Sequence, residues 1–107
     1  MANYGLVGSL RSEVEIPKGG ILSRTVYEDE RLALTLFAFD AGQELTEHAS
    51  SRAAIIEVLE GSAEFVLDGE SQTAGPGTWI AMPPGMRHAL RATAPMVMAL
   101  TLLKPPA

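Results

Sequence analysis

The sequence predicts an all-β protein built of about eight to ten short antiparallel strands, as in a sandwich or barrel. Turn-forming glycine and proline residues recur about every 8–12 positions, which is the spacing of short strands. The same residues interrupt nearly every stretch long enough to form a helix. The pair Asp68-Gly69 is the strongest hairpin signal, because both central positions of a type I′ turn need positive φ.

The apolar or alternating segments between these turns are the expected strands. They span residues 13–16, 21–27, 32–39, 55–59, 63–67, 78–82, 88–92 and 96–103. Segment 13–16 alternates in polarity and predicts an edge strand. Segment 32–39 is apolar almost throughout, which predicts a strand covered on both faces.

A chain of 107 residues has room for one hydrophobic core. We therefore expect a single domain over residues 1–107. Its core barrel would span about residues 30–103, with N-terminal strands over about residues 10–27.

The charge and composition of the chain exclude some classes of binding partner. With 13 acidic and 8 basic residues the net charge is −5, and the basic residues are scattered. This argues against nucleic acid and anionic membranes as binding partners. The chain has no cysteine, and its first residues lack the pattern of a signal peptide. We therefore expect a cytoplasmic protein.

Two motifs of defined spacing each contain a glycine followed by a histidine. The later motif contains Gly77, Pro83, Gly85 and His88, and the earlier one contains Gly42, His48 and Gly61. In this spacing the chain resembles the cupins, which are small β-barrels of jelly-roll type. The resemblance implies a cupin-type jelly-roll barrel with its ligand site inside the barrel.

The resemblance also implies a divalent transition metal (Fe, Mn, Ni, Cu or Zn), which cupins typically hold with three histidines and a glutamate. Here only His48 and His88 stand at those positions, because Ser50 and Ala54 replace a histidine and the glutamate. Glu44 is the candidate third ligand, since an even separation places it on the face of His48 if the strand is regular. Catalytic metal sites normally have at least three protein ligands.

Three interpretations of the histidine pair remain open. The pair binds a metal completed by water, binds a small acidic or polar ligand directly without metal, or is structural. A methionine-rich lining would suit an apolar ligand, although methionine is more often core filler. The expected cavity-lining residues are Ser50, Ala54, Met82 and Met98.

Two function classes follow from these interpretations. One is a metal-dependent enzyme resembling cupin oxygenases or isomerases, and the other is a non-catalytic binding or sensing protein. No catalytic residue is assigned, because neither a nucleophile elbow nor a phosphate-binding loop is present in the sequence. Small size, the apolar segment 32–39 and the cupin resemblance predict a homodimer, in which the edge near residues 13–27 would pair with the second copy. Trp79 is expected in the core or in the subunit interface.

Overall fold

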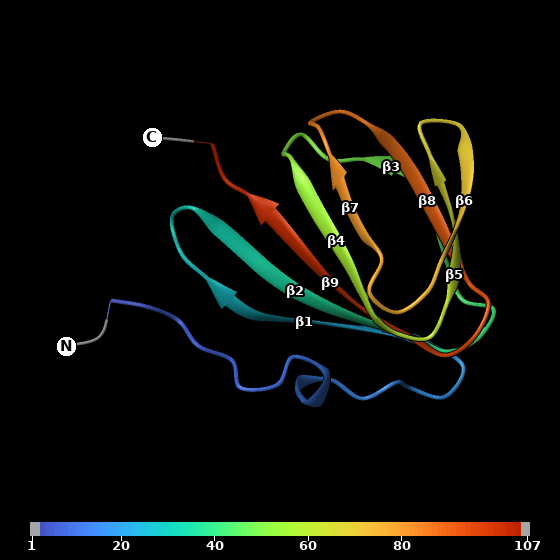
Figure 1. Ribbon diagram of the computed structural model, residues 1–107, viewed down its shortest axis with the longest axis horizontal. Coiled ribbons are helices and arrows are strands. Elements are labelled where there is room, and N and C mark those ends of the chain that lie inside the picture. The colour runs from blue at the N-terminus through green and yellow to red at the C-terminus, as the bar shows by residue number, and fades with distance from the viewer. Residues whose placement is uncertain (1–2, 106–107) are drawn as a thin grey trace.

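The computed structural model describes residues 3–105 and confirms the all-β class. Nine antiparallel strands form two sheets that face each other (Figure 1). The five-stranded sheet has the order β1-β2-β9-β4-β7 and the four-stranded sheet the order β3-β8-β5-β6. The strands are β1 (Ile21–Glu28), β2 (Leu32–Phe39), β3 (Glu44–Ala49), β4 (Ala54–Glu60), β5 (Ala63–Leu67), β6 (Glu70–Ala74), β7 (Trp79–Met82), β8 (Arg87–Ala92) and β9 (Met96–Leu103).

The main core lies between the two sheets. Alternate residues of the central strands point into it, as the pleat of a strand requires. Phe39 and Phe65 are the largest side chains that are fully buried there, and Met96 and Met98 fill the space beside them. No helix within residues 3–105 is long and apolar enough to cross a membrane.

A second core covers the outer face of the five-stranded sheet. Leu36 and Ala38 of β2 and Val97 and Ala99 of β9 point outward and are buried beneath the N-terminal segment. This segment runs along the sheet in Figure 1 and includes one 3-10 turn, Arg11–Glu13. Strand β2 is therefore apolar on both faces because both faces are covered.

The expected edge strand at residues 13–16 is wrong. Val14 is 4% exposed and packs against the outer face of the sheet, so its alternation with Glu13 and Glu15 reflects packing on a face. The carbonyls of Glu13 and Val14 accept hydrogen bonds from the Arg24 and Arg11 guanidinium groups, at 3.0 and 2.9 Å. Arginine side chains thus satisfy backbone groups that a neighbouring strand would otherwise pair.

The hairpin at Asp68-Gly69 is confirmed. Both residues have positive φ, 51° and 84°, and they join β5 to β6. Strands β3 and β6 had no apolar pattern to predict them, because nearly all their residues are exposed. Strand β3 is nevertheless the element that brings His48 to the candidate site.

Candidate functional site

The two histidines meet at one end of the four-stranded sheet. His48 of β3 and His88 of β8 are directly opposed in the antiparallel register, and their ring centres are 4.2 Å apart with planes tilted by 59°. His48 is exposed, whereas His88 is only 8% exposed. Two segments that are forty residues apart in sequence therefore present one pair of imidazoles.

Each imidazole is held by its own strand. Nδ1 of His48 lies 2.8 Å from the carbonyl oxygen of Thr46, and Nδ1 of His88 lies 3.1 Å from that of Met86. A carbonyl oxygen can only accept a hydrogen bond, so Nδ1 is the donor in each of these contacts, and in a neutral imidazole held this way the lone pair is on Nε2. The histidines that ligate metals in proteins are commonly oriented by this kind of hydrogen bond.

A β-bulge sets which residues of β3 share the histidines' face. Leu45 pairs with Leu90 and His48 pairs with His88, so three residues of β3 advance against two of β8. The extra residue reverses the alternation, and Leu45 shares the inner face with His48. Glu44 instead lies opposite Arg91, whose parity places it on the outer face.

The expectation that Glu44 shares the face of His48 is therefore wrong. It rested on a regular strand, and the bulge was not visible in the sequence. Within residues 3–105 no three histidine, cysteine, aspartate or glutamate side chains lie close enough together to hold one ion. The candidate site consists of two imidazoles without a third ligand of these types from the described chain.

The expected lining residues lie on the facing sheet and the loops beside it. Ala54, Met82 and Met98 point toward the four-stranded sheet but are at most 3% exposed, so they belong to the packed core. Ser50 lies in the loop after β3, where its carbonyl accepts a hydrogen bond from Gly85 N–H at 2.7 Å. That bond ties the β3–β4 loop to the β7–β8 turn at the end where the histidines lie.

The carboxylates of β3 and of the neighbouring part of β5 lie on the outer face. Glu47 forms an ion pair with Arg87 at 2.8 Å, and both side chains are exposed. Arg87 thus points away from the histidine face, as strand alternation predicts. Glu64 also lies on the outer face, opposite Arg91, and its Oε1 accepts a hydrogen bond from Thr73.

The carboxyl groups with shifted pKa lie elsewhere in the fold. The Arg31 guanidinium and the Tyr27 hydroxyl donate to Asp29 and hold its pKa well below the ordinary value. Arg11 lowers the pKa of Glu60 in the same way. These ion pairs anchor the β1–β2 turn and the N-terminal segment.

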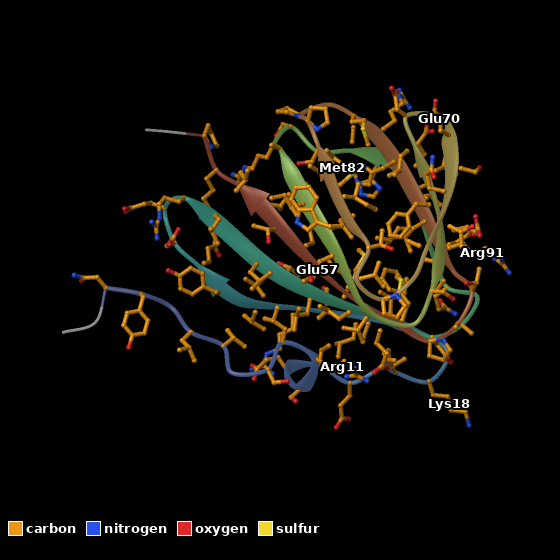
Figure 2. The ribbon with its side chains drawn as sticks, in the orientation of Figure 1. Arg11, Lys18, Glu57, Glu70, Met82 and Arg91 are labelled. Carbon is orange, nitrogen blue, oxygen red and sulfur yellow. The ribbon has the colours of Figure 1, made fainter. Side chains whose placement is uncertain are left out.

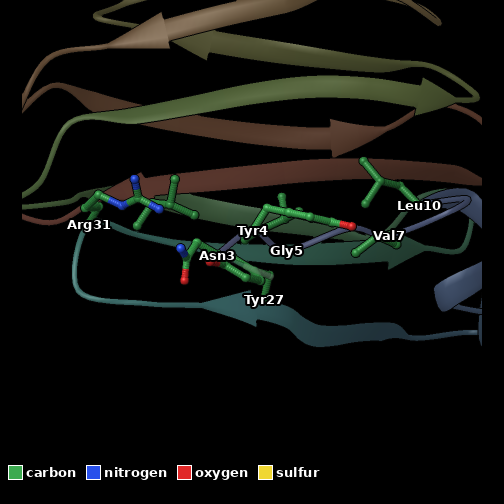
Figure 3. A pocket seen from close by; sticks show the side chains of 9 residues that line it. Asn3, Tyr4, Gly5, Val7, Leu10, Tyr27 and Arg31 are labelled. Atoms are coloured by element: carbon green, nitrogen blue, oxygen red, sulfur yellow. The ribbon is translucent and has the colours of Figure 1, made fainter. Parts of the chain in front are cut away.

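Two hollows are candidate binding sites apart from the histidine pair. One, of about 560 Å³, separates the N-terminal segment from the outer side of β1 and β2, with Tyr4, Tyr27 and Arg31 among its lining residues (Figure 3). The other, of about 390 Å³, is a groove between the edge strands β6 and β7. Trp79 lines this groove and is 61% exposed, so of its two expected places, core or subunit interface, the core is wrong and the interface stays a prediction.

Comparison with known proteins gives a consistent picture. Residues 35–103 match the Cupin domain family. A search of curated proteins found no significant match. A conserved Streptococcus pyogenes protein of unknown function is 37% identical, with a TM-score of 0.85 over 99% of this chain and 93% of the other.

Two further solved structures share the fold. An RmlC-like cupin protein from Desulfovibrio desulfuricans is 30% identical, with a TM-score of 0.78 over 99% of each chain. KdgF from a Halomonas species is 24% identical, with a TM-score of 0.78 over 91% of this chain and 94% of the other. At that identity the likeness to KdgF concerns the fold alone.

Proposed function

The chain belongs to the cupin family, and we propose that it is a small-molecule-binding cupin whose His48–His88 pair holds a divalent transition metal. The observation that carries the proposal is the arrangement of the two imidazoles. Both Nδ1 atoms are committed to backbone carbonyls, which leaves both Nε2 atoms as ligands. Imidazole ligands suit Fe, Ni, Cu and Zn, and Mn is a further candidate.

The ring separation is compatible with one shared ion. A metal about 2.0–2.2 Å from each nitrogen needs the two nitrogens to lie roughly 3 Å apart. Rings whose centres are 4.2 Å apart are close enough for one ion to contact a nitrogen of each. Two protein ligands leave several coordination positions for water or for a ligand.

The charge around the pair indicates which ligands would bind. Two neutral imidazoles leave the charge of a divalent ion uncompensated, and Glu44, Glu47 and Glu64 lie on the other face of the sheet. An anionic ligand, such as a carboxylate, would neutralise the centre. The ion, when bound, would polarise an oxygen atom of that ligand as a Lewis acid.

Elemental analysis of protein purified without an affinity tag tests this proposal. We expect near-stoichiometric metal, either as isolated or after incubation with Fe, Mn, Ni, Cu or Zn. Metal should be lost in His48→Ala and retained in Glu44→Gln, because that carboxylate lies on the outer face. His48 is the better site for substitution than His88, because an exposed side chain contributes less to folding.

A metal-free binding site is the second candidate function. The absence of a third His, Cys, Asp or Glu ligand near the pair within residues 3–105 favours it. In this case the two imidazoles bind an acidic or polar ligand through hydrogen bonds. Two results together would support this candidate and exclude the metal. The protein would neither contain nor gain any of the five metals, and small carboxylates would stabilise the natural chain but not His48→Ala.

The homodimer expected from the sequence remains a proposal, now with a different surface. Several apolar side chains are exposed on the outer side of the five-stranded sheet, among them Leu22 and Leu103, and the N-terminal segment carries Tyr4 and Leu6. Burial of this surface in a second copy would remove apolar area from water. Light scattering across a concentration series tests it, and a monomer at all concentrations would contradict it.

A further inference from the structure

The groove between β6 and β7 combines features of a binding site that is separate from the histidines. Its volume of about 390 Å³ is in the range of small-molecule sites. Its base is apolar, with Phe65 fully buried and Leu67 and Ile80 partly buried. Its exposed rim carries polar side chains, including Glu70 and Gln72.

The sheet register places this groove next to the histidine pair. Leu67 of β5 lies directly opposite His88, and Glu70 of β6 lies directly opposite Leu67. Because neighbouring strands are about 4.8 Å apart, Glu70 stands roughly 10 Å from His88 along one row of the sheet. Figure 2 shows Glu70 at the same end of the molecule as Met82, which lies on the opposite sheet.

The chemistry of the lining selects the ligand. Glu70 is the one charged residue among the described residues that line the groove, and within residues 3–105 it forms no ion pair. The indole of Trp79 is 61% exposed at the rim. The carboxylate attracts an organic cation, and the apolar base accommodates a hydrocarbon body. Trp79 lies opposite Glu57 in the register, on the outer side of the rim.

We propose that this groove binds a small organic ammonium ion, with its apolar body on Leu67 and Ile80 and its charged group at Glu70. The ligand thus differs in charge from the anion expected at the histidines. The net charge of −5 favours the approach of a cation. The groove does not depend on whether the histidines bind a metal.

Trp79 provides the assay, because it is the only tryptophan of the chain. Its fluorescence is titrated with 2-cyclohexylethylammonium, and with 2-cyclohexylethanol and 3-cyclohexylpropanoate as neutral and anionic analogues. We expect a saturable change with the ammonium probe at concentrations at least about tenfold lower than with the alcohol, and no binding of the carboxylate. Amide chemical shifts of Leu67 and Ile80 should move in the same titration.

Three variants test which residues bind the ammonium ion. Glu70→Gln should reduce ammonium binding about tenfold, to the level of the alcohol. Glu57→Gln is the matched control, because Glu57 pairs with Trp79 across β4 and β7 but does not line the groove. It should leave binding unchanged, and so should His48→Ala, which tests the histidine site alone.

Several results would overturn the proposal. They are the absence of a saturable response to the ammonium probe, equal binding of the alcohol or the carboxylate, and unchanged binding in Glu70→Gln. Tryptophan emission that changes with protein concentration alone would assign Trp79 to contact between two copies instead. Loss of metal from His48→Ala together with unchanged ammonium binding would keep both the metal site and the groove.

Discussion

Replacement of Gly61 by alanine tests how the two sheets are joined. Gly61 lies at the corner where the chain leaves β4 in one sheet and enters β5 in the other. An added Cβ would overlap the carbonyl oxygen of Pro95 and lie 2.8 Å from Cα of Met96. These are backbone atoms at the start of β9, and Met96 is fully buried, so they cannot move aside cheaply.

Gly42 is the matched control. Its φ of +85° is close to the +79° of Gly61, but an added Cβ would meet no atom within 4 Å. Alanine in a left-handed conformation costs about 1–2 kcal/mol at either position. The overlap at Gly61 adds about 2–3 kcal/mol, as overpacking of a core does. We therefore expect losses of about 1–2 kcal/mol for Gly42→Ala and about 3–5 kcal/mol for Gly61→Ala.

Urea unfolding followed by circular dichroism measures both losses, provided that the m-value is unchanged. A domain of this size loses roughly 4 °C in Tm for each kcal/mol, so Gly61→Ala should melt about 12–20 °C lower than the natural chain. Equal losses in the two variants would refute the reasoning. They would mean that the Pro95–Met96 backbone shifts to accept the methyl group at no cost.

Two other predictions concern the turn and segment that cover the outer face. The lowered pKa of Asp29, caused chiefly by Arg31, means that the unfolded chain binds the proton more readily than the folded one. The free energy of unfolding should thus fall as the pH drops below about 4. In Asp29→Asn the urea midpoint should fall less steeply with decreasing pH than in the natural chain, and an equal dependence on pH in both would contradict this. A Cβ on Gly5 would lie 2.6 Å from Cδ1 of Tyr27, whereas one on Gly8 would meet nothing within 4 Å. Gly5→Ala should therefore lower the free energy of unfolding by about 1–2 kcal/mol and make the N-terminal segment more susceptible to proteolysis. Gly8→Ala should do neither, and equal cleavage of the two variants would exclude this contact.

The strands that bury apolar residues were predictable from the sequence, because their alternation is dictated by the pleat. Strands β4 and β8 alternate in this way. Strands β2 and β9 were recognisable instead as continuous apolar runs covered on both faces, and the Asp68-Gly69 hairpin was recognisable by its turn residues. Residues 13–16 have the same alternation without pairing, because packing on a sheet face and pairing at a sheet edge bury the same residues. Periodicity reports burial and does not identify the neighbour.

The candidate site could be predicted only in part, for a related reason. The motif spacing brought His48 and His88 to attention, and the fold places their rings 4.2 Å apart. The parity rule failed for Glu44 because a β-bulge is decided by both strands of a pair, and the sequence of one strand does not show it. The groove at Trp79 was missed because β6 has no apolar pattern, although the single tryptophan was a signal.

The bulge in β3 also explains why the site lacks carboxylates. With regular alternation from His48, Glu44 would point toward the imidazoles and supply a negative charge beside them. The bulge gives that face to Leu45, which pairs with Leu90, and leaves Glu44 opposite Arg91 on the other side. The imidazoles consequently have Leu45 rather than an acid beside them, and among residues 3–105 the one acid in their row of the sheet, Glu70, stands two strands from His88. An anion at the histidines and a cation at the groove would therefore be attracted to separate places on one face of the sheet.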